Sequence, residues 1–170
     1  IVQAAIHYQG PQRLAVIQPE LGVSDVHYVY SAPAASFTPA VEGEDEWGCI
    51  WGQTDMKNMG QVVDHPLETI PDDLSMAKYP DYDDESRYGT MAEEIAVGKK
   101  ENKYIATSIF FVLWERIHAL HGFENSLCDL LTDRSAMERL ADHVLDVNLQ
   151  YVRNVSRRFP GQIDGCCMTD

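Results

Sequence analysis

The chain has 170 residues, enough for one domain with a hydrophobic core, and its 45% hydrophobic and 24% charged residues are typical of a globular protein. The net charge of −14 argues against a nucleic-acid-binding protein, because proteins that bind polyanions usually present a basic surface. No apolar run reaches the roughly 18 residues of a membrane-spanning helix, and no signal peptide is visible. We therefore expect a cytoplasmic protein that binds neither a membrane nor a nucleic acid.

The first 30 residues predict short elements separated by breaks. Ile1 to Tyr8 indicate the end of a helix, which Gly10-Pro11 interrupts. Arg13 to Ile17 predict a short buried strand. Val26 to Tyr30 are rich in β-branched and aromatic residues, which favours a second strand or an extended segment.

The segment from Glu42 to Glu94 carries most of the negative charge. It holds 15 acidic residues and only three basic ones, so it supplies −12 of the total of −14. Three prolines and a run of acidic residues from Asp81 to Glu85 lie within it. This composition predicts surface loops and short elements rather than a buried sheet, with a short hairpin that includes Met59 to Val63.

The next part of the chain alternates predicted helices with a strand. Nearly continuous apolar character over residues 104–112 predicts a buried parallel strand covered on both faces. Gly122 is expected to end the helical turn that precedes it in the chain, Trp114 to His121. The expected helices are Glu93 to Lys100, Trp114 to His121 and Phe123 to Leu131.

The strongest helical pattern runs from Ser135 to Arg158. Its apolar residues recur every three or four positions and predict one buried stripe: Met137, Leu140, Ala141, Val144, Leu145, Tyr151, Val152 and Val155. Ser135 with Glu138 fits a capping box, and Asp133 is an alternative cap. Ile163 to Met168 predict a strand after it.

The order strand, helix, strand predicts a βαβ unit with parallel strands and a right-handed crossover. A buried parallel strand normally leads into a covering helix, so we expect the chain to be incomplete after Asp170. The four cysteines, Cys49, Cys128, Cys166 and Cys167, form no Cys-x-x-Cys pair. We interpret them as reduced thiols that act as small buried apolar residues.

Three stretches together resemble the uroporphyrinogen decarboxylase superfamily, particularly its decarboxylase-like members. The first is Asp45 to Gly48 (Asp-Glu-Trp-Gly) with Trp51 and the following Met59 to Leu67, and the second is the acidic loop of residues 79–84. The third runs from Trp114 through the Gly-Phe-Glu-Asn of residues 122–125 to Asp164-Gly165 and Thr169-Asp170.

The resemblance implies an α/β fold, a (β/α)8 TIM barrel of which this chain is the N-terminal portion. Residues 1–100 would form an N-terminal segment with acidic loops, and residues 101–170 a βαβ unit of the barrel. The superfamily performs two kinds of chemistry. One is cofactor-free decarboxylation of uroporphyrinogen in porphyrin biosynthesis, and the other is zinc-dependent methyl transfer to or from a corrinoid (cobalamin) carrier.

Two departures favour the methyltransferase branch. The arginine-rich N-terminal segment of true decarboxylases is absent, and their Gly-Ala-Pro-Trp-Thr-Leu stretch is replaced by residues 107–115. The zinc ligands of the methyltransferase branch are expected beyond Asp170. The alternatives are decarboxylation of a tetrapyrrole substrate and a non-catalytic half-barrel. Such a half-barrel would bind a tetrapyrrole or use its acidic surface to bind a basic partner protein. The sequence also leaves open whether the chain forms a homo-oligomer.

The expected site residues follow the carboxyl ends of strands, where barrel enzymes place their active sites. Glu115 can serve as a general acid or base or support a metal ligand, and Arg116 can bind a substrate carboxylate; a surface ion pair is the structural alternative. Asp170 can act as a base or position a ligand. Trp114 and Trp47 are candidate substrate-binding residues, although tryptophans such as Trp47 also anchor loops.

His118 and His121 are spaced to share a helical face and hold a metal, or to act only in capping and solvation.

Overall fold

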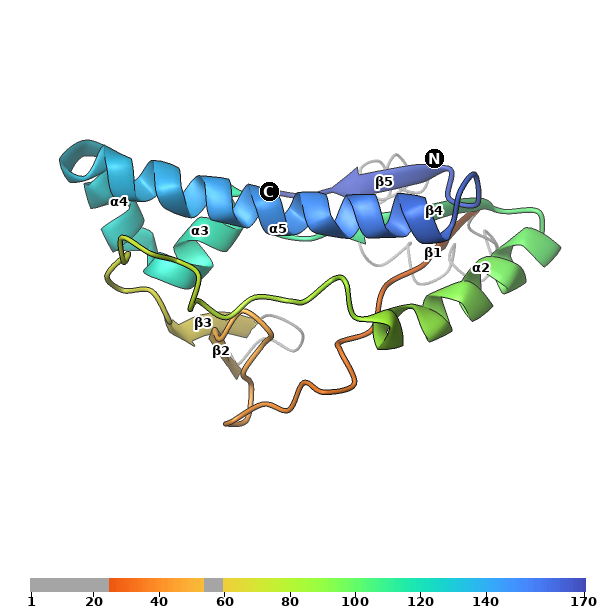
Figure 1. The fold of residues 1–170 in the computed structure, drawn as a ribbon, viewed down its shortest axis with the longest axis horizontal. Helices are drawn as coiled ribbons and strands as arrows, with labels where there is room; N and C mark the ends of the chain where they lie inside the picture. Colours follow the sequence, from red (N-terminus) through yellow and green to blue (C-terminus); the bar gives the residue numbers. More distant parts are fainter. Residues whose placement is uncertain (1–24, 54–59) are drawn as a thin grey trace, which may run out of the picture.

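The computed structural model describes residues 25–53 and 60–170, and it is a mixed α/β arrangement with two small sheets, neither closed into a barrel (Figure 1). The helix predicted at Ile1 to Tyr8 and the strand predicted at Arg13 to Ile17 lie outside the described residues, as does Met59. Within those residues, no helix is both long enough and apolar enough to span a bilayer.

A three-stranded parallel sheet forms one side of the molecule. Its order is β1 (Val26–Tyr28), β4 (Tyr104–Ile109), β5 (Gly165–Met168), with β4 in the centre. Ala106 of β4 lies opposite Tyr28 on one side and Gly165 on the other. The parallel pairing of β4 and β5 confirms the prediction of a βαβ unit.

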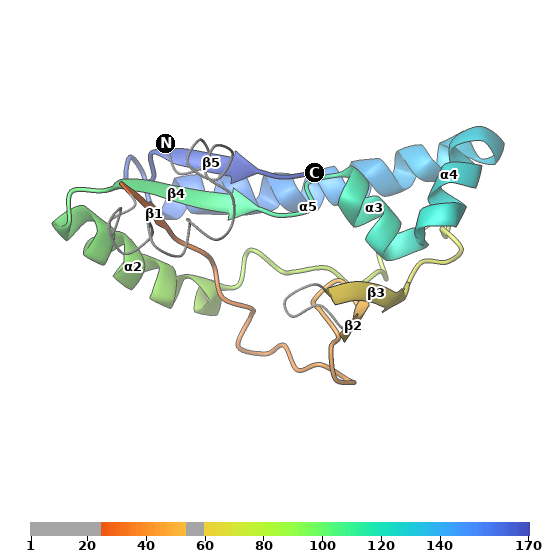
Figure 2. The same ribbon diagram turned by 180° about the vertical axis from the view of Figure 1, so that it is seen from behind.

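Helices make both connections between the parallel strands. The 3-10 helix η1 (Glu85–Tyr88) and α2 (Gly89–Lys100) lie between β1 and β4 in the chain. Between β4 and β5 lie α3 (Trp114–His121), α4 (Phe123–Thr132) and α5 (Arg134–Arg158). Figures 1 and 2 show α2 and α5 on the same face of the sheet, and no described helix covers the opposite face.

The expectation that residues 104–112 form a strand is wrong at its C-terminal end. The strand ends at Ile109, and two residues later Phe111 adopts a left-handed backbone conformation with φ of 58°. Ile105 and Ile109 are buried against the helices, whereas Tyr104 is 50% exposed on the other face. The described helices cover only one face of β4, yet Ala106, whose side chain points to the face of Tyr104, is also buried.

The long helix α5 connects two hydrophobic clusters. Its C-terminal half joins the cluster that packs beneath the parallel sheet, through Tyr151 and Val155. Its N-terminal half joins a second cluster, through Leu140, Val144 and Val147. The predicted stripe is therefore largely confirmed, but Leu145 is wrong, because it is 47% exposed.

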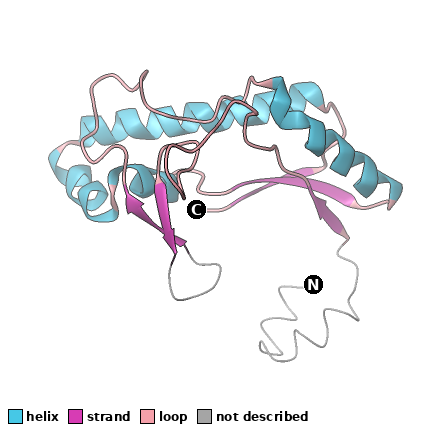
Figure 3. Ribbon diagram, turned by 90° about the horizontal axis from the view of Figure 1, so that it is seen from below, coloured by secondary structure: helices cyan, strands magenta, loops and turns pink. Residues whose placement is uncertain are grey.

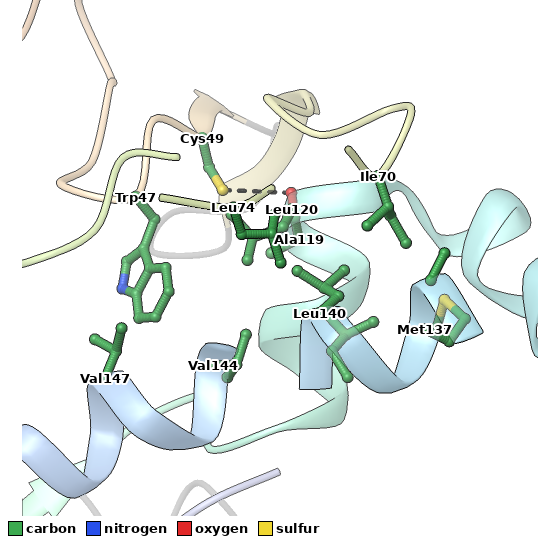
Figure 4. Packing of buried hydrophobic residues seen from close by; sticks show 12 residues of the cluster. Trp47, Cys49, Ile70, Leu74, Ala119, Leu120, Met137, Leu140, Val144 and Val147 are labelled. Atoms are coloured by element: carbon green, nitrogen blue, oxygen red, sulfur yellow. Dashed lines mark hydrogen bonds between the residues drawn. The ribbon is translucent and has the colours of Figure 1, made fainter. Parts of the chain in front are cut away.

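The second cluster lies between α3, α5 and the acidic segment. In that segment β2 (Ile50–Gln53) and β3 (Gly60–Asp64) form an antiparallel hairpin, which confirms the predicted one. The other described residues between 42 and 84 form loops and turns, as the charge and proline content predict. Figure 3 shows the hairpin apart from the parallel sheet, and Figure 4 shows Trp47, Cys49 and Leu74 packed toward Leu140 and Val144.

Helix boundaries follow their caps. Asp133 caps α5 by accepting a hydrogen bond from the backbone N–H of Ala136 at 3.1 Å. The predicted capping box of Ser135 and Glu138 is wrong, since Glu138 instead pairs with Arg134 across one helical turn. The alternative prediction, Asp133 as the cap, is confirmed.

The prediction of free thiols agrees with the structure for all four cysteines, but the prediction of burial is right only for Cys49. All four thiols are free, and Cys49 is completely buried, with Sγ 3.3 Å from the carbonyl oxygen of Ala119. Cys128, Cys166 and Cys167 are exposed. Cys166 and Cys167 belong to β5, which is at the edge of the three-stranded sheet, so their apolar character does not lead to burial.

Candidate functional site

The candidate site lies at the carboxyl end of β4, where three distant segments meet. A pocket of about 230 Å³ is lined there by residues that include Tyr30 after β1, Glu46 and Trp47 of the acidic segment, and Arg116 of α3. The loops that follow parallel strands are where α/β proteins place binding residues. Trp47 and Arg116, two of the predicted site residues, are brought together here.

Arg116 is held by one carboxylate and two aromatic rings. Its Nη1 lies 3.2 Å from Asp45 Oδ2, and the guanidinium lies 4.9 Å from the centre of the Trp47 ring and 5.4 Å from that of Phe111. Such cation–π contacts strengthen when they are shielded from water, and Arg116 is only 8% exposed. Trp47 is itself buried, so it anchors the loop and supports Arg116 rather than acting as an open lid.

Asp45 organises the turn that carries these groups. Its Oδ1 accepts hydrogen bonds from the backbone N–H groups of Trp47 at 3.0 Å and Cys49 at 2.9 Å. Its Oδ2 accepts a hydrogen bond from Trp51 Nε1 at 2.9 Å as well as the one from Arg116. The carboxylate therefore fixes both the turn and the guanidinium.

Phe111 adds a strained backbone to the same region. A positive φ is uncommon for a residue with a side chain and costs roughly 1–3 kcal/mol. The Phe111 ring stacks on Trp51, with 5.7 Å between ring centres, and lies under the guanidinium of Arg116. These contacts hold the unusual conformation, and strain of this kind is concentrated at functional sites.

A second ion pair, Arg87 with Glu46, also lines the pocket. Two hydrogen bonds of 2.5 and 2.8 Å join the guanidinium to the two carboxylate oxygens, and Arg87 also lies over the ring of Tyr82. Burial alone would lower the pKa of Arg87, but the hydrogen bonds and charge of Glu46 outweigh it and raise the pKa. The sequence prediction missed both residues. A signal was present, because Arg87 is one of only three basic residues in the acidic segment.

Asp170 is placed at the N-terminus of α3. Its carboxylate accepts hydrogen bonds from the backbone N–H groups of Leu113, Trp114 and Glu115 at 2.9–3.2 Å. Partial burial raises the pKa of Asp170, but these three hydrogen bonds outweigh it and lower the pKa. The carboxylate thus caps the helix that carries Arg116, which is a positioning role rather than that of a free base.

The remaining predicted residues are not among those that line this pocket. Glu115 lines a separate pocket together with His118, and Trp114 packs against the His118 ring, with 6.0 Å between ring centres. His121 points elsewhere: its two ring nitrogens lie 2.7 Å from the Leu67 carbonyl oxygen and 3.0 Å from Asp129 Oδ2. The structure therefore does not bring His118 and His121 to one metal site.

No three His, Cys, Asp or Glu side chains within residues 25–53 and 60–170 are arranged to hold a metal ion. Comparison of the chain with protein-family models, with curated proteins and with solved structures gave no match.

Proposed function

We propose that this chain is part of a barrel enzyme of the uroporphyrinogen decarboxylase type that transfers a methyl group between a small molecule and a corrinoid carrier. The region around Arg116 would help to bind the small molecule. The observation that carries this proposal is the contact of Arg116 with Asp45 and Trp47. These residues belong to separate stretches of the resemblance, and they meet at the carboxyl end of a parallel strand.

The sheet order supports a barrel. Strands β1, β4 and β5 are adjacent in the order in which they occur in the chain, and α2 and α5 lie on one face (Figure 2). A barrel requires this order, with helices outside and side chains filling the inside. A doubly wound sheet instead reverses its strand order and carries helices on both faces.

The charge of the site favours a small substrate over uroporphyrinogen, which carries many carboxylates. Arg87 and Arg116 line the pocket, and each is already paired with a carboxylate. A polycarboxylate would need free cations, so this arrangement supports methyl transfer rather than porphyrin decarboxylation. In this proposal Arg116 donates a hydrogen bond to the small molecule, while Asp45 and Trp47 hold the guanidinium in place.

Zinc would activate the methyl acceptor as a Lewis acid when it is bound. The described residues offer no group that fits a zinc ion, so they give zinc no step in the reaction.

The test is corrinoid turnover by the complete enzyme of which we propose this chain is part, supplied with zinc. Methylcobalamin and a thiol acceptor are mixed with the protein, and loss of the methyl group is followed from the corrinoid absorption spectrum. We expect Arg116→Met to slow the reaction by about tenfold or more, the loss expected for one charge-assisted hydrogen bond to the substrate. Arg134→Met removes an exposed arginine of α5 and should leave the rate unchanged.

Conversion of uroporphyrinogen without zinc, together with no reaction of methylcobalamin, would contradict the proposal and restore the decarboxylase alternative.

A further inference from the structure

A second pocket, of about 400 Å³, is lined by residues of the β2–β3 hairpin, of α3 and of the segments next to them. Its wall includes two histidines, one glutamate and three aromatic rings: His65, His118, Glu115, Trp51, Phe111 and Phe123. We propose that this pocket binds a small protonated amine with an aromatic or apolar body.

His65 provides a fixed hydrogen-bond acceptor. Its Nδ1 lies 2.8 Å from the carbonyl oxygen of Ala119. A carbonyl oxygen can only accept, so Nδ1 carries the proton, and in the neutral ring Nε2 is left with a lone pair. Ala119 is buried within α3, so the ring is held against a rigid element. His65 therefore presents a lone pair to a ligand that donates a hydrogen bond.

Glu115 provides the negative charge. It lies in the first turn of α3, and within the described residues its carboxylate forms no ion pair, in contrast to Asp45, which is paired with Arg116. A carboxylate that accepts a hydrogen bond from an ammonium group forms a charge-assisted bond, roughly twice as strong as a neutral one. Among the described residues that line the pocket there is no lysine or arginine, so these residues offer an anionic ligand no counter-charge.

The aromatic rings provide the apolar walls. Trp51 and Phe111 stack with ring planes 21° apart, and Phe123 meets the His118 ring edge to face, with 5.7 Å between ring centres. Such rings bury an apolar ligand body, and their faces attract a cation within about 6 Å. Two acceptors among aromatic rings are thus complementary to an arylalkyl ammonium ion.

Binding is tested on the full chain by isothermal titration calorimetry with three probes of similar size. Benzylamine is protonated at pH 7, benzyl alcohol is neutral and phenylacetate is an anion. We expect benzylamine to bind at least about tenfold more tightly than either of the other two, the discrimination expected from one charge-assisted hydrogen bond. Equal binding of benzylamine and phenylacetate, or no binding of benzylamine, would overturn the proposal.

Two variants locate the binding. Glu115→Gln should weaken benzylamine binding by about tenfold, whereas Glu124→Gln makes the same charge change on the exposed start of α4 and should have no effect. Phe123→Ala removes a ring that is largely exposed, so it should leave folding intact and weaken binding severalfold. Equal weakening by Glu124→Gln and Glu115→Gln would show that the amine is attracted by the net negative charge of the protein. The pocket would then not be its binding site.

This proposal is independent of the methyl-transfer proposal, because the titration measures binding without turnover. Failure of either experiment leaves the other proposal standing.

Discussion

Arg87 and Glu46 are 41 positions apart in the chain, yet they form a doubly hydrogen-bonded ion pair. Arg87 is 2% exposed, so its charge depends on Glu46 for compensation. Breaking a buried pair by removing one partner leaves the other charge without a counterion, which costs far more than the net contribution of the pair itself. The pair therefore fixes the position of the Asp45 to Gly48 loop rather than adding much net stability.

We predict that Arg87→Met lowers the free energy of unfolding by about 3–5 kcal/mol, because Glu46 is left as a partly buried unpaired carboxylate. The matched control is Arg134→Met, which removes an arginine from the exposed pair with Glu138 and should change stability by less than about 0.5 kcal/mol. Urea unfolding followed by circular dichroism measures both. Similar losses in the two variants would show that the buried pair is not important for folding.

Among the elements, α3 has the most direct link to function, because it carries both Arg116 and Glu115. Its N-terminus is capped from the end of β5 by Asp170, 55 to 57 positions away in the chain. A carboxylate at a helix N-terminus satisfies N–H groups that have no partner within the helix and interacts favourably with the helix dipole. The cap thus links β5 to α3.

We predict that Asp170→Asn destabilises the protein by about 1 kcal/mol at pH 7, the usual contribution of such a cap. The pKa of Asp170 is lowered in the folded state. The unfolded chain therefore takes up the proton first as the pH falls, and the contribution of the ionised cap, present above about pH 4, is lost below it.

Thermal unfolding of the unmodified protein and of Asp170→Asn at pH 7 and pH 3 tests this pH dependence. The difference in stability between the two proteins should be smaller at pH 3 than at pH 7. The control Asp142→Asn changes an exposed carboxylate within α5 and should show no such difference. A larger difference at pH 3 than at pH 7 would contradict the assignment.

At the scale of the whole molecule, Cys49 reports whether the hairpin region and the helices are packed together. Its thiol lies within the cluster that joins α3, α5 and the acidic segment (Figure 4). Burial, with a smaller effect of the Asp45 charge, raises the pKa of Cys49 to about 12. The thiolate is the reactive form, so Cys49 is protected both by exclusion of solvent and by its protonation.

We predict that a disulfide reagent such as DTNB at pH 8 modifies the three exposed thiols of the folded protein and modifies Cys49 only when the protein unfolds. Cys166 should be the slowest of the exposed three, because partial burial and the neighbouring Cys167 raise its pKa. Mass spectrometry after peptide digestion assigns the sites. Modification of Cys49 as fast as Cys128 would show that this cluster opens readily.

Local pattern in the sequence determined much of this fold. The periodicity of α5 placed its ends within a residue, and the strand–helix–strand order predicted the parallel pairing of β4 with β5. Such features depend on neighbours within one or two turns, or on the alternation of side chains along a strand, and so they are visible in the chain itself.

Only the tertiary structure decided the features that depend on distant partners. In the structure β4 ends at Ile109, and Cys128 and the two β5 cysteines are exposed. Arg87 pairs with Glu46, and Asp170 caps the N-terminus of α3. Trp47 and Arg116 were expected in the site from the resemblance and from their position after a strand, but their contact was not. Which face of a strand is covered, and which charge meets which, follow from packing between elements, and no local pattern encodes that packing.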